Sequence, residues 1–192
     1  MVRRLNCDVP GAFVHVTTRG NNRGRVYLDE FDYVAWLRLL RRTVERFEWR
    51  CHGFCQMPNH FHLLIELTSA TLAAGMQHLN GSYARRINTR YERTGHVFQG
   101  PYTGDLVLDD EHFIAASRYI ALNPVRAGLC ADPAEWRWSS FRATAGLEHH
   151  PPYLVVDFTR AMFGGGVSGA RAYRELVAAG ATSQDLVLGL GQ

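Results

Sequence analysis

Two histidines one residue apart, His60 and His62, form the pattern in this sequence that is best suited to chemistry. If the segment is a β-strand, their side chains point to the same face, with Cα atoms roughly 6.6–6.8 Å apart. Two imidazoles placed in this way can converge on one metal ion, while Phe61 points to the opposite face and enters the core. The motif is short and arises by chance, so alone it does not separate a metal site from two partly exposed histidines.

A second candidate pair, Tyr119 and Asn123, lies in a segment with helical periodicity. The two residues are four positions apart and therefore share one helix face. An amide oxygen is a hard ligand suited to Mg²⁺ or Mn²⁺, and a tyrosine one turn away is placed to attack a phosphorus atom held by that metal. Both residues also have ordinary structural interpretations, as a core tyrosine and as an asparagine that ends a helix before Pro124.

The elements that must hold these residues follow from hydrophobic periodicity and from turn residues. The patterns predict strands at 12–18, 49–56 and 60–67, a turn at 57–59, a loop at 19–25 and a broken strand within 97–107. They predict helices from Asp29 to about Phe47, from a Ser69 cap to about Arg93, and from Asp109 or Asp110 to just before Pro124. This order matches an α+β fold of the ferredoxin-like, split βαβ type. Beyond residue 130 we expect covering segments and a short helix near 168–179.

Five segments in this order resemble the REP-associated tyrosine transposases, members of the IS200-like group of HUH transposases that act on single-stranded DNA. They run from Met57 to Ile65 (MPNHFHLLI), from Arg118 to Leu129 (RYIALNPVRAGL), from Thr17 to Arg23 (TTRGNNR), from Gly95 to Gly100 (GHVFQG) and from Trp136 to Ser140 (WRWSS). Several ordered motifs spanning about residues 12 to 141 are far more specific than any one of them.

The resemblance implies an antiparallel sheet with helices on one face, plus an additional C-terminal catalytic helix and a tail. It implies that Tyr119 is the nucleophile and that His60, His62 and Asn123 hold a divalent metal, Mg²⁺ or Mn²⁺. The expected activity is cleavage and rejoining of a single-stranded, REP-like DNA hairpin through a 5′-phosphotyrosine intermediate. The expected organisation is a transposase domain at 1–141 and an extension of unknown role at 142–192.

Arginine-rich segments supply the candidate DNA contacts, because a guanidinium suits phosphate oxygens. The candidates from the resemblance are Arg19, Asn21, Asn22 and Arg23, and those from charge clustering are Arg85, Arg86 and Arg90. Nearby aromatic residues are candidates for base stacking or for the core: Tyr83, Tyr91, Phe98 and Tyr102. One departure is that Pro101-Tyr102-Thr103 follows Gly100 where related proteins often carry a basic residue.

The sequence leaves open three alternatives to a metal-dependent tyrosine transposase. A zinc module would use Cys51, Cys55, His60 and His62, although two cysteines four residues apart on a strand lie about 13 Å from one another. A non-catalytic hairpin-binding protein would retain the DNA surface alone. A hydrolytic metallonuclease would use water instead of Tyr119 as the nucleophile.

Composition sets the broad class of the protein. Hydrophobic residues make up 46% and charged residues 20% of the 192 positions, which is ordinary for a globular domain. The net charge of +3 is weak support for a nucleic-acid partner. We expect no membrane span, no disulfides among the four cysteines and a cytoplasmic location. The sequence does not decide between a monomer and a homodimer.

Overall fold

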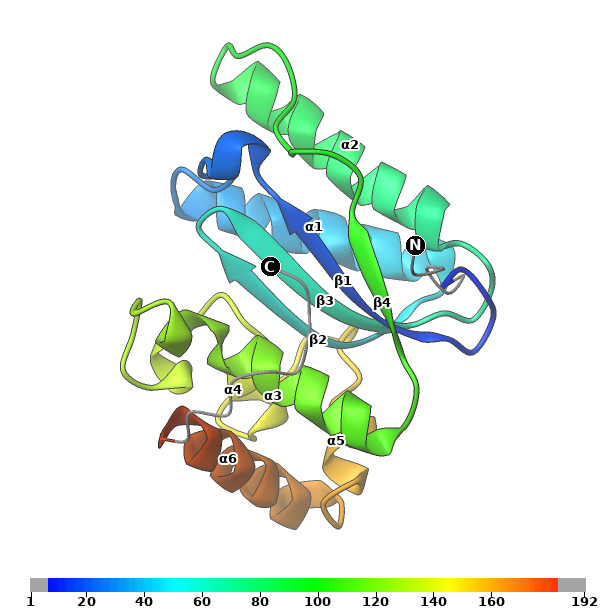
Figure 1. Cartoon of the computed structure of the whole chain (residues 1–192), viewed down its shortest axis with the longest axis vertical. Helices are drawn as coiled ribbons and strands as arrows, with labels where there is room; N and C mark the ends of the chain where they lie inside the picture. The colour runs from blue at the N-terminus through cyan, green and yellow to red at the C-terminus, as the bar shows by residue number, and fades with distance from the viewer. Residues whose placement is uncertain (1–6, 183–192) are drawn as a thin grey trace, which may run out of the picture.

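The computed structural model describes residues 7–182 and is built around one four-stranded antiparallel sheet (Figure 1). The strands are β1 (Phe13–Arg19), β2 (Arg50–Met57), β3 (His60–Glu66) and β4 (Thr103–Val107). Their order across the sheet is β2-β3-β1-β4, with every neighbouring pair antiparallel. This arrangement confirms the predicted ferredoxin-like topology.

Helices cover both faces of the sheet. The helices on one face are α1 (Glu30–Phe47) and α2 (Leu72–Arg90), and the group on the other consists of α3 (Asp110–Arg126), α4 (Phe141–Thr144), α5 (Val156–Ala161) and α6 (Gly166–Thr182). The first group completes the split βαβ core, whereas α3 is the additional helix expected after it. None of the helices in the described range is both long enough and apolar enough to cross a bilayer.

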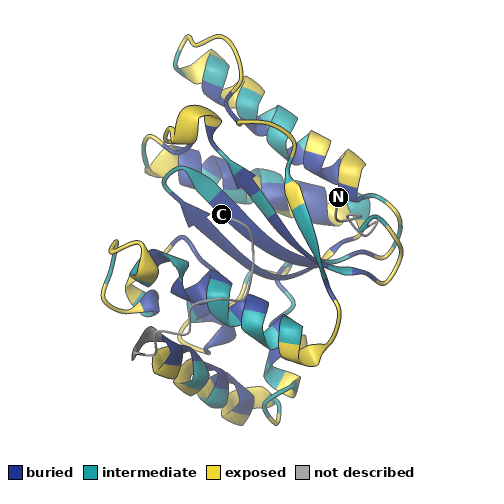
Figure 2. Ribbon diagram, viewed as in Figure 1, coloured by how far each residue is buried: buried dark blue, intermediate teal, exposed yellow. Residues whose placement is uncertain are grey.

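Strand β3 separates the two sides of the molecule residue by residue. Phe61 and Leu63 are fully buried in the core beneath α1 and α2, whereas Leu64 belongs to the apolar cluster beneath α3. His60 and His62 alternate with Phe61 and Leu63 along the strand and therefore share the α3 face with Leu64. Figure 2 shows β2 and β3 almost entirely buried between the two groups of helices, whereas the edge strand β4 is mostly intermediate or exposed. The predicted core position of Phe61 is thus confirmed.

The start of α2 differs from the sequence prediction. Ser69 was expected to cap this helix, but the helix begins at Leu72, and Thr71 at the cap position makes no side-chain cap bond. The carboxylate of Asp8 accepts hydrogen bonds from the backbone N–H groups of Leu72 (2.8 Å) and Ala73 (3.3 Å) instead. A carboxylate from a distant segment thus satisfies the free N–H groups of the first turn, which local sequence rules do not detect.

The end of α3 is a second correction. The helix was expected to stop before Pro124, yet it continues to Arg126 with Pro124 inside it. Proline removes only one backbone donor here, and the bonds from Ala127 N–H to the Asn123 carbonyl and from Leu129 N–H to the Pro124 carbonyl carry the turn onward. Asn123 therefore lies within the helix and on the face that carries Tyr119.

The C-terminal region packs on the outer side of α3. Ala121 and Leu122 of α3 form one buried cluster with Tyr173 and Val177 of α6. Farther upstream, the segment around Trp138 covers the edge of β2, with backbone bonds from Gln56 N–H to the Trp138 carbonyl and from Ser140 N–H to the Phe54 carbonyl. The expected covering role of this segment is confirmed. Residues 1–6 of the expected transposase domain and residues 183–192 of the expected extension lie outside the described part of the chain.

Candidate active site

The four residues singled out as catalytic meet between the end of the sheet and α3. The ring centroids of His60 and His62 lie 5.0 Å apart, and that of Tyr119 lies 5.5 Å from that of His62. Asn123 is one turn beyond Tyr119 and interacts with the His60 side chain. A strand and a helix far apart in sequence thus place two imidazoles, a phenol and an amide around one site.

His62 is buried, and only one of its ring nitrogens has a partner. Its Nδ1 lies 3.0 Å from His15 Nε2 and 3.0 Å from Thr17 Oγ1, both on β1. Its Nε2 is buried without a hydrogen-bond partner. Burial lowers the pKa of His62 well below its ordinary value, and the nearby His15, His60 and Arg19 lower it further. The ring is therefore neutral at physiological pH and retains a lone pair for a ligand.

His60 is half-buried at the mouth of the site. Its Nδ1 lies 2.7 Å from Asn59 Oδ1, and its cross-strand partner in the sheet is Arg19. Burial lowers its pKa to about 4, Arg19 contributes in the same direction, and the interaction with Asn123 opposes the shift. His60 is accordingly neutral near pH 7, the state that a metal ligand requires.

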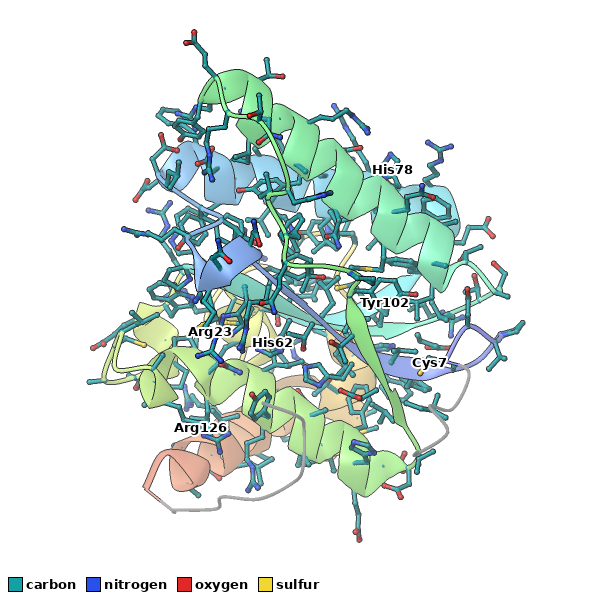
Figure 3. All side chains as sticks on the ribbon, turned by 45° about the horizontal axis from the view of Figure 1, so that its top comes forward. Cys7, Arg23, His62, His78, Tyr102 and Arg126 are labelled. Carbon is teal, nitrogen blue, oxygen red and sulfur yellow. The ribbon has the colours of Figure 1, made fainter. Side chains whose placement is uncertain are left out.

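Tyr119 is half-buried on α3, with its ring beside the histidines. The Arg126 guanidinium lies over this ring, 5.5 Å from the centroid, and the ring centroid of His15 lies 5.9 Å from that of Tyr119 in a T-shaped arrangement. In Figure 3, Arg23 and Arg126 lie toward the same end of the molecule as His62, whereas Cys7 and Tyr102 lie toward the other. Arginine side chains therefore lie at the same end of the sheet as the Tyr119 phenol.

The donor set is compatible with a divalent metal ion, although it is not an acidic or cysteine-rich one. Among residues 7–182, no group of three or more His, Cys, Asp and Glu side chains converges in a way that would hold a metal. The candidate set is instead the two imidazoles of His60 and His62 together with the Asn123 amide oxygen. An asparagine amide is not one of the four side-chain types in that group. The unpartnered Nε2 of His62 and the neutral state of both rings fit this use.

The geometry contradicts a zinc module built with Cys51 and Cys55. A β-bulge between Cys51 and Gly53 shifts the register, so the two thiols belong to different apolar clusters on opposite faces of the sheet. Burial raises the pKa of Cys51 to about 12 and raises that of Cys55 further, which disfavours the thiolate that zinc binds. One ion cannot reach both side chains.

The candidate DNA contacts fall into two groups. Arg19 lies opposite His60, and the 3₁₀ turn Asn21–Arg23 that follows it is exposed at the same end of the sheet. Arg85 and Arg86 are exposed on α2, on the opposite face. Arg90 is engaged in ion pairs with Asp29 and with the buried carboxylate of Asp32, where its Nη1 donates at 2.6 Å.

The aromatic residues considered for base stacking are mostly part of the core. Tyr83 is fully buried and donates to the Val26 carbonyl at 2.7 Å, and Phe98 is also buried, as expected. Tyr91 donates to Asp32 at 2.9 Å. Tyr102 packs against the core cluster on the α1–α2 side, so it lies on the other face from Tyr119.

Four residues of the site were not identified from the sequence. His15 and Thr17 contact His62, Asn59 contacts His60, and Arg126 covers Tyr119. For His15 and Thr17 a signal existed, because alternation along the predicted strand places them on the face that receives His62. Nothing local to Asn59, a residue of the turn, indicates its contact.

Comparisons with known proteins agree with this geometry. The family model described as "Transposase IS200 like" matches residues 8–123. A protein of Haemophilus influenzae described as a REP-associated tyrosine transposase is 25% identical over 142 residues, which cover 68% of this chain and 80% of that protein. The structure of a REP-associated tyrosine transposase bound to a REP hairpin superposes with a TM-score of 0.66 at 13% identity, covering 79% of this chain and 89% of that one.

Proposed function

The chain belongs to the IS200-like transposase family, a family of DNA-cleaving and strand-transferring enzymes, and from that premise we propose that it cuts and rejoins single-stranded DNA with Tyr119 as the nucleophile. One observation carries this proposal. The phenol of Tyr119 stands beside the paired imidazoles of His60 and His62, with the rings of Tyr119 and His62 5.5 Å apart. A nucleophile next to a potential metal site is the arrangement that phosphoryl transfer needs.

The proposed step is an in-line displacement at phosphorus. The Tyr119 oxygen forms a bond to the phosphorus atom while the bond from phosphorus to the 3′-oxygen breaks. The hydroxyl proton leaves the tyrosine, and the departing 3′-oxygen gains one, so the products are a 5′-phosphotyrosine and a free 3′-hydroxyl. Because this exchange conserves a phosphodiester bond, attack by a second 3′-hydroxyl reverses it and joins strands.

His60, His62 and the Asn123 amide oxygen would hold Mg²⁺ or Mn²⁺. When bound, the ion would neutralise charge on a non-bridging phosphate oxygen and favour attack at phosphorus. His15 and Thr17 hold Nδ1 of His62 and thereby fix the orientation of its ring. Arg126, over the Tyr119 ring, favours the negative charge that develops on the phenol oxygen.

We further propose a DNA hairpin as the substrate. The support is the structural similarity to a protein that was solved with a REP hairpin. It is consistent with the exposed arginines at the site end of the sheet, since phosphate contacts supply most of the affinity for nucleic acid. Arg19 and the 20–25 loop are positioned to contact the strand that enters the site.

The proposal is tested with a hairpin oligonucleotide taken from beside the gene, labelled separately at each end and incubated with Mn²⁺ or Mg²⁺. We expect a protease-sensitive protein–DNA adduct on a denaturing gel, together with a fragment whose free 3′-hydroxyl a polymerase extends. Tyr119→Phe should bind the hairpin and form no adduct. Cleavage that persists in Tyr119→Phe would indicate a water nucleophile, and binding without cleavage in the wild type would indicate a non-catalytic DNA-binding protein.

A further inference from the structure

We propose that Asn59 is a positioning residue that uses its single amide to orient His60 for metal binding and to anchor the 20–25 loop, so that the two parts of the site are coupled. The inference rests on the proposed function, because it assumes that His60 is a metal ligand. Asn59 contacts neither the proposed metal nor the nucleophile. It acts through its two hydrogen-bond partners, His60 and the backbone of Arg23.

The orientation of the Asn59 amide follows from its partner in the loop. Its Nδ2 donates to the backbone carbonyl of Arg23 at 3.0 Å. A carbonyl oxygen only accepts hydrogen bonds, so the nitrogen of the amide must face Arg23. The amide oxygen therefore faces the other way, where it lies 2.7 Å from Nδ1 of His60.

This orientation in turn determines the tautomer of His60. An amide oxygen carries no proton, so Nδ1 of His60 must be the donor in their hydrogen bond. In the neutral ring, Nε2 is then the nitrogen that keeps a lone pair. His62 shows a matching arrangement, with Nδ1 occupied by β1 and Nε2 without a partner. Nδ1 is thus engaged in both imidazoles, and in His60 the Asn59 amide leaves the lone pair on Nε2.

The loop that Asn59 anchors has a strained backbone. Asn22 and Arg23 both adopt left-handed conformations, with φ of 50° and 56°. Asparagine tolerates this region, whereas Arg23 needs its surroundings to hold it there. Besides its side-chain bond, Asn59 accepts from Gly20 N–H at 2.7 Å through its backbone carbonyl. The turn before His60 therefore holds the loop at two points, one in the backbone and one in the amide.

The two hydrogen bonds of the amide can be separated by substitution. Asn59→Asp keeps an acceptor oxygen for Nδ1 of His60 but loses the donor to Arg23, whereas Asn59→Leu loses both at similar volume. Asn88 is the matched control, since its Nδ2 donates to the Gly95 carbonyl at 2.9 Å in another loop. Asn88→Asp and Asn88→Leu thus reproduce the chemical changes away from His60.

The first measurement is Mn²⁺ binding to the full chain without DNA, followed by loss of the free-ion electron paramagnetic resonance signal. Asn59→Leu should bind Mn²⁺ about 10- to 100-fold more weakly than the wild type, the usual effect of removing the partner of a ligating histidine. Asn59→Asp should bind at least as tightly as the wild type, and neither Asn88 variant should change. Equal affinity in Asn59→Leu, or equal weakening in both Asn59 variants, would overturn the role in orienting His60.

The second measurement is the rate of limited trypsin cleavage after Arg23 in the metal-free protein, read by mass spectrometry. Loss of one net hydrogen bond should raise this rate by about 2- to 12-fold in both Asn59 variants and in neither Asn88 variant. An unchanged rate in Asn59→Asp, which should fold even where Asn59→Leu does not, would overturn the anchoring of the loop. A wild-type protein that binds no Mn²⁺ would instead overturn the proposed metal site, and the coupling with it.

Discussion

Acid should destabilise the metal-free protein through His15, and the size of the effect follows from its burial. The His15 side chain is 2% exposed, and burial, with a smaller contribution from His112, lowers its pKa to about 4. In the unfolded chain the imidazole titrates near its ordinary value of about 6.5. Between these two values the unfolded state binds a proton that the folded state does not. His15 therefore leaves the free energy of unfolding unchanged above about pH 6.5 and lowers it progressively as the pH falls toward 4.

The expected loss from this one residue is about 2 kcal/mol between about pH 7 and about pH 5. The assay is urea unfolding of the wild type and of His15→Gln across this range in the presence of a chelator. Glutamine does not titrate. Between about pH 7 and about pH 5, the free energy of unfolding of His15→Gln should therefore fall by about 2 kcal/mol less than that of the wild type. Because only the slopes are compared, a stability difference at neutral pH does not affect the result. Parallel curves would refute the conclusion that His15 is buried in its neutral form.

Three further predictions concern the surroundings of the site. The hydroxyls of Ser117 and Tyr173 lie 3.1 Å apart between α3 and α6. A double-mutant cycle of Ser117→Ala and Tyr173→Phe should therefore give a coupling energy of about 1 kcal/mol in urea unfolding. Additive effects of the two substitutions would contradict this contact. Replacing Arg85 and Arg86 by glutamine should weaken hairpin binding and reduce its salt dependence by about one unit of slope per arginine, whereas Arg90→Gln should mainly lower the melting temperature. An unchanged salt slope would exclude α2 from the DNA surface. A chelator should abolish cleavage and added Mn²⁺ restore it, so cleavage that survives chelation would argue against the metal.

The alternating pattern of β3 and the periodicity of the amphipathic helices predicted the elements and their order along the chain, because both are local features. His-Phe-His in a strand places the two histidines on one face and the phenylalanine on the other without information from elsewhere, and the structure shows this separation at His60, Phe61 and His62. The caps formed by Asp29 and Asp109 were likewise predictable, since each side chain accepts from an N–H group within its own first turn.

Features that depend on distant contacts escaped sequence reasoning. The start of α2 is set by Asp8, more than sixty residues away, and not by Ser69. Charge clustering likewise does not reveal that Arg90 forms ion pairs with Asp29, before α1, and with Asp32, within it. Alternation along β1 places His15 and Thr17 on the correct face, but choosing them as the partners of His62 required the register of β1 against β3. In each case the decisive contact joins segments whose spacing carries no periodic signal.

Locating the covalent bond in the protein–DNA adduct tests directly whether Tyr119 is the nucleophile. The wild-type protein is allowed to react with the hairpin, the adduct is digested with nuclease and trypsin, and the nucleotide-linked peptide is sequenced by mass spectrometry. The tryptic peptide 119–126, YIALNPVR, contains one tyrosine and no other side chain that would attack phosphorus. We expect a 5′-linked nucleotide on Tyr119 in this peptide and none in Tyr119→Phe. A nucleotide linked to any other peptide would contradict this expectation.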